Sequence, residues 1–346
     1  MNYLKSIKLL SIILAGSLIS YSCSDDDDAN GGGGDTDTSV RLFASNNSNG
    51  NITIYDVTDQ SSITSKTLIT TSTAADGVYY NSSTDAVIQA SRSGLSLEGF
   101  NDTTDLLSGV TVDVDLSGTN DMDSPREVAV NGNFYVVADN ADVDGNDLTA
   151  DGRLFVYELN GNAFTLRNVI TTDFKLWGIT FINNNLYAVV DATNQLAVFN
   201  SFLTNTTDAT VPASKTIEIE GIVRTHGLTY DSASNVMILT DIGSAMNTQD
   251  DGGFHIIENF SNKFSNTTDG GILSVTEQTR VSGASTQLGN PVDVAYDSES
   301  ETVFIAEAGN NGGRILAFNN IGSGGDIAPA VNNSLASASA VYLSKD

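Results

Sequence analysis

The chain has 346 residues, of which 43 are acidic, 15 are basic and only one is a cysteine, so its formal net charge is −28. This charge disfavours nucleic acid and anionic lipid surfaces as partners, and it favours divalent cations or basic protein surfaces. With a single cysteine, the chain forms no internal disulfide.

The N-terminal segment has the pattern of a secretion signal. Lys5 and Lys8 precede an apolar run over residues 9–19, and small residues then lead to Cys23. The run is too short for a membrane-spanning helix. The position of Cys23 resembles the lipidation site of bacterial lipoproteins, which implies that residues 1–22 are removed and that the thiol carries a lipid. A plain cleaved signal is the alternative.

An acidic and glycine-rich stretch over residues 23–39 follows the signal. Cys23 is followed directly by Ser24, Asp25, Asp26, Asp27 and Asp28, and residues 31–34 are glycines. Such a composition cannot bury a core and predicts a solvated tether. The stretch from Cys23 to Asp28 also resembles the export signal of Bacteroidota surface lipoproteins. This resemblance implies a lipid-anchored protein on the outer membrane that faces the cell exterior.

A short strand motif recurs six times in the remaining chain. Its first apolar residues are Val78, Val128, Ile179, Leu228, Val294 and Val341, at spacings of 50, 51, 49, 66 and 47 residues. This period is typical of the blades of a β-propeller. Further apolar strands follow most copies, and their β-branched and aromatic residues favour an all-β fold.

The other expected strands follow from the same alignment. Second strands are expected at residues 87–90, 134–138, 186–190, 236–240 and 303–306. Third strands are expected at 95–100, 154–157, 196–199, 254–257 and 315–318, and fourth strands at 110–116, 165–171 and 215–220. The N-terminal strands at 41–44, 52–55 and 66–69 lack a first strand, whereas the last copy is a lone first strand. We therefore expect residues 40–346 to form one six-bladed β-propeller with four-stranded antiparallel blades, in which the two ends share a blade and leave no open seam.

One repeat resembles a known propeller family. Residues 291–297 read Pro-Val-Asp-Val-Ala-Tyr-Asp, and Val-Phe-Ile-Ala-Glu and Gly-Gly-Arg-Ile-Leu-Ala-Phe follow. This sequence is similar to an NHL-type repeat, and the resemblance extends over about residues 40–346. It implies the architecture but no particular activity, because such propellers include scaffolds, ligand binders and enzymes.

The residues that begin the inner strands are expected to meet at one mouth of the central channel. With their neighbours, these candidate binding residues are Asp76, Arg126, Glu127, Trp177, His226 and Asp293. Trp177 is the only tryptophan and His226 is one of two histidines, and such side chains are enriched in binding pockets. Two interpretations stay open: a mouth that binds a small molecule or glycan, or structural ion pairs with Trp177 as packing.

Catalysis has weak support in this set. Propeller hydrolases of the lactonase type hold a catalytic calcium with Glu, Asp and Asn side chains in the channel. Only Asp76, Glu127 and Asp293 match that set in residue type. We expect a non-catalytic protein and keep lactonase-like hydrolysis as a minor alternative.

The loop at residues 139–151 resembles a calcium-binding loop. Its candidate ligands are Asn140, Asp142, Asp144 and Asp151. The first three alternate along the chain, Gly145 permits a sharp turn, and Asp151 stands where a last carboxylate would close the coordination shell. A solvated acidic turn is the alternative, because acidic loops are common in so acidic a chain.

Two functions from different classes are consistent with these features. In the first, the propeller is a non-catalytic interaction subunit of an outer-membrane β-barrel complex for assembly, secretion or nutrient uptake. In the second, it binds a small molecule or glycan at the channel. The sequence alone does not choose between them.

Overall fold

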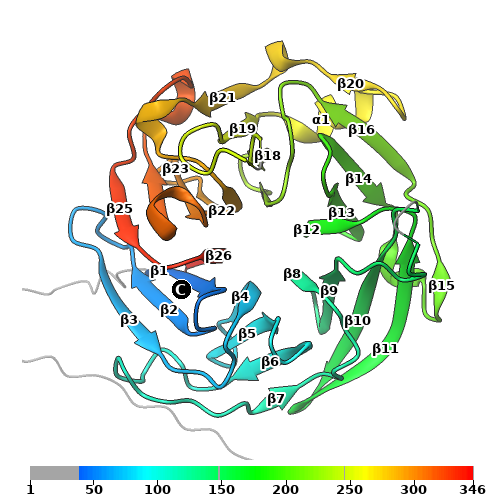
Figure 1. Ribbon diagram of the computed structural model, residues 1–346. Helices are drawn as coiled ribbons and strands as arrows, with labels where there is room; N and C mark the ends of the chain where they lie inside the picture. Colours follow the sequence, from blue (N-terminus) through cyan, green and yellow to red (C-terminus); the bar gives the residue numbers. More distant parts are fainter. Residues whose placement is uncertain (1–38, 147–148, 245, 346) are drawn as a thin grey trace, which may run out of the picture. The chain divides into compact units, whose positions relative to one another are not determined.

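The computed structural model describes residues 39–345 apart from 147–148 and 245. These residues belong to one compact unit. They form six sheets of four or five strands arranged as a ring (Figure 1), which confirms the expected all-β, six-bladed propeller. The signal segment and most of the tether, with Cys23, Ser24 and the four aspartates, lie outside the described residues. Within the described part, no helix is long and apolar enough to cross a membrane.

Each blade runs from an inner strand at the channel to an outer strand at the rim. Blade 1 consists of β26 (Ala338–Lys345), β1 (Val40–Asn46), β2 (Ile52–Asp56) and β3 (Thr64–Leu68). Blade 2 consists of β4 (Ala75–Asn81), β5 (Ala86–Ser91), β6 (Ser96–Phe100) and β7 (Leu116–Ser117). Blade 3 consists of β8 (Pro125–Asn131), β9 (Phe134–Asp139), β10 (Gly152–Asn160) and β11 (Ala163–Thr172), with β15 (Ala209–Thr210) added outside.

The other three blades follow the same order. Blade 4 consists of β12 (Leu176–Ile182), β13 (Asn185–Val190), β14 (Gln195–Phe199) and β16 (Lys215–Ile219), with β20 (Ile272–Leu273) added outside. Blade 5 consists of β17 (Leu228–Asp231), β18 (Val236–Asp241), β19 (Gly253–Ile257) and β21 (Thr279–Ser282). Blade 6 consists of β22 (Pro291–Asp297), β23 (Thr302–Glu307), β24 (Arg314–Phe318) and β25 (Val331–Ser334).

The two ends of the propeller close the ring within blade 1. The C-terminal strand β26 pairs with β1 from Val40↔Lys345 to Asn46↔Ala338, with a bulge near Ser45. The expected shared blade is therefore confirmed. Without this pairing, the backbone N–H and C=O groups of β1 that face the channel would have no strand partner.

Four seams between blades carry an additional outer strap. In each, the segment before an outer strand pairs in parallel with the outer strand of the preceding blade: β15 with β11, β20 with β16, Thr111 with Ile69, and Gly325 with Val281. The fourth strand of blade 2, expected at residues 110–116, was therefore predicted too long. Thr111 pairs with the preceding blade, blade 1, and only Leu116–Ser117 pair within blade 2. These straps also explain the fifth strands of blades 3 and 4.

The apolar core is divided into six clusters, each of which lies between two neighbouring blades. Between blades 1 and 2, for example, the rings of Phe43 and Tyr80 stack with centroids 4.2 Å apart. Alternate residues of a strand point to opposite faces, so each blade contributes to two clusters. The inner strands approach so closely that a Cβ on Gly77 would lie 2.6 Å from the Val128 nitrogen of the next blade.

In the part of the chain that the structure describes, helical structure is limited to short segments in the loops between strands. The helix α1 (Phe260–Asn266) buries Phe260 and Phe264, one turn apart, against Tyr187 of blade 4. Short 3-10 turns lie at Phe202–Thr204, Val275–Glu277, Ala284–Thr286, Asn310–Gly312 and Ile321–Ser323.

Candidate binding sites at the channel and in an acidic loop

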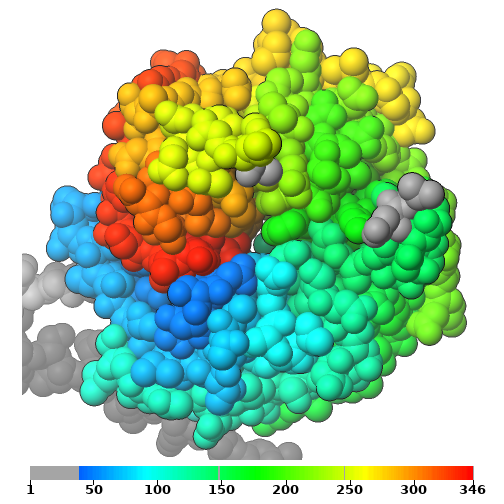
Figure 2. Space-filling model, viewed as in Figure 1, coloured from blue at the N-terminus to red at the C-terminus, as the bar shows by residue number. Residues whose placement is uncertain are grey.

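One face of the ring, which we call the mouth face, carries the starts of the inner strands. The strand registers place the loops between second and third strands of each blade on the same face, because each inner strand runs antiparallel to its neighbour. Two of these loops, residues 140–151 and 242–252, are long. Figure 2 shows this face, on which only a narrow opening remains at the centre of the ring.

Four of the candidate mouth residues form one continuous stack across blades 2 to 5. The Arg126 guanidinium lies 4.0 Å from the centre of the Trp177 ring. On the other face of this ring, His226 stacks at 3.7 Å with an interplanar angle of 6°. Asp76 binds Arg126 at 2.9 Å between Oδ2 and Nη1. Both faces of Trp177 are thus covered by protein, so the indole is not available to stack on a ligand in this arrangement.

Asp191, which directly follows β13, anchors the far end of the stack. Its carboxylate lies 2.9 Å from Arg224 Nη2, accepts a hydrogen bond from Asn140 Nδ2 at 2.9 Å, and lies 3.3 Å from His226 Nε2. Burial alone would raise the pKa of Asp191, but contacts with His226, Asn140 and Arg224 outweigh it and lower this pKa. Burial lowers the pKa of His226 more than Asp191 raises it, so the imidazole is neutral at neutral pH.

Asp191 was not among the residues predicted from the sequence, although a repeat signal exists. An acidic residue ends or follows the second strand in four blades: Asp139, Asp191, Asp241 and Glu307. Three of these side chains accept backbone N–H groups of the segment that leads into their own inner strand, such as Ser124 to Asp139 at 2.5 Å and Asn290 to Glu307 at 2.8 Å. They fix the start of the inner strand. Asp191 alone of these four contacts the mouth stack.

The remaining two candidates, Glu127 and Asp293, line a cavity within the channel. This cavity has a volume of about 430 Å³ and is lined by the inner strands of all six blades. Burial and the neighbouring Asp293 raise the pKa of Glu127 well above its usual value. Burial also raises the pKa of Asp293 to about 7, although its Oδ2 accepts the Val341 N–H at 2.8 Å. The six predicted residues therefore divide into a closed stack and a pair of channel carboxyl groups.

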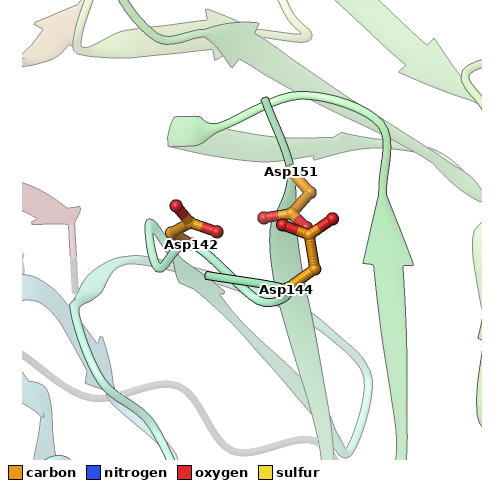
Figure 3. A group of neighbouring side chains, drawn as sticks. All are labelled: Asp142, Asp144 and Asp151. Carbon is orange, nitrogen blue, oxygen red and sulfur yellow. The ribbon is translucent and has the colours of Figure 1, made fainter. Parts of the chain in front are cut away.

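The acidic loop on the mouth face brings together three of its four predicted ligands (Figure 3). Carboxylate oxygens of Asp142, Asp144 and Asp151 lie within 4.8 Å of one another. Asn140 is directed instead to Asp191. Each carboxylate also accepts a backbone N–H within the loop: Gly145 to Asp142, Asn146 to Asp144 and Val143 to Asp151. Gly145 has a φ of +70°, as a sharp turn around a cation requires.

Calcium remains a proposal for this loop and is tested by thermal melting. If calcium binds only the folded protein, a concentration of a hundred times Kd should stabilise it by about 2.7 kcal/mol. The double change Asp142→Asn and Asp144→Asn should remove this gain, because the amide oxygens keep both turn hydrogen bonds but carry no charge. Asp250→Asn with Asp251→Asn, in the other long acidic loop, should leave the gain unchanged. Equal melting curves with calcium and with chelator would show a solvated turn.

The ring and its channel define the class of this protein as a six-bladed β-propeller, with a stack of its own side chains at the mouth of the channel. No family model matches the chain, and no curated protein sequence matches it. A chain in the crystal structure of the Nidogen/Laminin complex is similar to it, with a TM-score of 0.57, 13% sequence identity and coverage of 88% of this chain and 98% of that chain. At this identity the likeness shows the fold alone, and the resemblance to NHL-type repeats stays a prediction.

Proposed function

We propose that this protein is a lipid-anchored surface lipoprotein whose propeller is a non-catalytic interaction subunit of an outer-membrane β-barrel complex. The anchor rests on the sequence around Cys23 and on the run from Ser24 to Asp28. A tether of this composition would hold the rigid ring away from the membrane surface while leaving it free to turn. The partner would be a membrane protein of the same surface.

The observation that carries the interaction role is an apolar patch on the rim between blades 1 and 2, which we call the rim patch. It consists of Ile69, Leu107 and Val110, whose side chains are 40%, 77% and 36% exposed. Their backbones are neighbours in the strap between these blades, because the Ile69 N–H binds the Val110 carbonyl at 2.9 Å and the Val110 N–H binds the Leu107 carbonyl at 3.4 Å. Grouped exposed apolar side chains with a polar surround are typical of protein-binding surfaces.

A partly buried lysine gives the rim patch a defined shape. Lys66 Nζ donates to the carbonyl oxygens of Thr103 and Leu106 at 3.1 and 2.9 Å, and it also binds that of Thr104. Burial lowers the pKa of Lys66, with Asp85 acting in the opposite direction. These contacts hold the loop before Leu107 against β3. A preformed surface loses less conformational entropy on binding than a flexible one does.

Cross-linking on intact cells tests the interaction role. Wild-type protein should yield one integral outer-membrane protein in stoichiometric amount, and Leu107→Asp should reduce its recovery by about tenfold or more. The matched control is Ile272→Asp, which alters a 60% exposed residue in the strap between blades 4 and 5. Equal recovery with Leu107→Asp and wild type would exclude the rim patch as the binding surface.

The anchor is tested by cell fractionation. Cys23→Ala removes the thiol that would carry the lipid, so the variant should leave the membrane fraction and appear in the soluble fraction or medium. Replacement of Asp25 to Asp28 by Ala should leave the protein in the membrane but protected from protease added to intact cells. Retention of Cys23→Ala in the membrane would refute lipid anchoring, and unchanged protease access would refute the export signal.

A further inference from the structure

The cavity in the channel is separate from the rim patch and from the stack of Asp76, Arg126, Trp177 and His226, which we call the mouth stack. Within the described part of the chain, its lining includes neither Arg126, Trp177 nor His226. It extends along the inner strands from Glu127 and Asp293 toward the strand ends opposite the mouth face, where Asp231 and Leu343 contribute to it. At about 430 Å³, it is in the size range of small-molecule pockets.

The cavity exists because one repeat position is occupied unequally around the ring. The third residue after the motif start is Tyr79 in blade 2 and Tyr342 in blade 1, but the equivalents in the other blades are Ala129, Thr180, Thr229 and Ala295. The rings of Tyr79 and Tyr342 lie 4.8 Å apart and line one side. The small residues opposite leave the space open. Phe181, Tyr230 and Tyr296 add aromatic surface to the cavity toward the end of the channel opposite the mouth face.

The charge in this cavity has one sign. Its lining includes three acids, Glu127, Asp231 and Asp293, and among the described residues no lysine, arginine or histidine contributes to it. Asp293 is only 5% exposed and is held by the Val341 N–H, so its carboxyl group is fixed in place. Burial raises the pKa of Tyr296, which lines the cavity too, and the nearby acids Glu301, Asp231, Asp297 and Glu258 raise this pKa further.

We propose that the channel binds a small organic cation, a protonated or quaternary amine, between the carboxyl groups of Glu127 and Asp293 and the rings of Tyr79 and Tyr342. The ring faces would supply cation–π attraction, and a bound cation would favour the ionised forms of Glu127 and Asp293, which burial alone disfavours. A bare metal ion fits less well, because the cavity is far larger than an ion. Within the described residues, Glu127 and Asp293 also form no group of three close acidic or histidine ligands.

Calorimetry on the full chain tests this site with choline, tetramethylammonium and putrescine, each at up to millimolar concentration. At least one of these cations should bind with a stoichiometry of one. The neutral isostere of choline, 3,3-dimethyl-1-butanol, should bind at least about tenfold more weakly, because it has the shape without the charge. Absence of binding by all three cations, or equal binding of choline and its isostere, would overturn the proposal.

Two isosteric variants locate the site. Glu127→Gln and Asp293→Asn should each weaken cation binding by about tenfold or more. Asp113→Asn, at an exposed position outside the channel, should not change it. If Asp293→Asn fails to fold, Glu127→Gln decides alone, and unchanged affinity in that variant contradicts the site. The outcome is independent of the rim patch, since Leu107→Asp should bind the cation like wild type.

Discussion

Deletion of residues 336–346 should unfold the propeller or leave it aggregated. The deletion removes β26, which supplies the whole inner strand of blade 1 and all seven residue pairs with β1. It also removes the buried Ala338, Ala340 and Val341 from two interblade clusters. The Val341 N–H, which binds Asp293 Oδ2, is lost as well. The expected loss exceeds about 5 kcal/mol, which is comparable to the whole stability of many domains.

Circular dichroism and analytical ultracentrifugation of the truncated chain give the measurement. A synthetic peptide of residues 336–346 provides the control, because it should pair with β1 and restore the melting transition, whereas a scrambled peptide should not. This outcome would attribute the defect to the open edge rather than to chain length. A truncated protein that stays monomeric and melts like wild type would contradict closure through β26.

Asp191→Ala should destabilise the fold by about 2–3 kcal/mol and disturb the mouth stack. The substitution leaves Arg224 and Asn140 without the carboxylate that they contact at 2.9 Å. It also removes the acid beside His226, which covers one face of Trp177. Since Trp177 is the only tryptophan, its fluorescence reports the stack directly, and a shift of the emission to longer wavelength is expected as water reaches the ring.

The effect of Asp191 should depend on pH in a defined direction. Because its folded-state pKa is lowered, its stabilisation is complete above the unfolded-state value of about 3.9 and is lost as pH falls through the lower folded value. The difference in unfolding free energy between wild type and Asp191→Asn should therefore be largest near neutral pH and shrink in acid. Asp113→Asn serves as the exposed control. An unchanged difference down to about pH 2 would contradict this role.

The architecture was predictable because its signals are local and repeated. The spacing of Val78, Val128 and their counterparts identifies six inner strands, and the missing first strand at the N-terminus identifies the shared blade. The third strands of blades 2, 4, 5 and 6 were placed to within one residue at each end, whereas β10 of blade 3 begins two residues earlier and ends three residues later than expected. Residue 95 was wrongly included in one of them, because Leu95 takes a left-handed φ of +54° in the turn before β6.

The candidate site was predictable only as a set of positions. Repeat alignment places Asp76, Arg126, Trp177 and His226 at one repeat position, and in the structure their side chains contact one another in sequence around the ring. It does not show that Arg126 and His226 cover both faces of Trp177. It also does not show that Asn140, expected beside Asp142, turns to Asp191. Each of these contacts joins side chains from different blades.

The sequence by itself thus determined the number of blades and the closure of the ring, because both follow from a strand motif that repeats along the chain and from the missing first strand at its N-terminal side. Only the tertiary structure decided which side chains meet between blades and where the outer straps pair with the preceding blade. It also decided that Tyr79 and Tyr342 lie across a cavity from small residues. The physical reason is that contacts between blades depend on the twist and spacing of whole sheets, which no short stretch of sequence encodes.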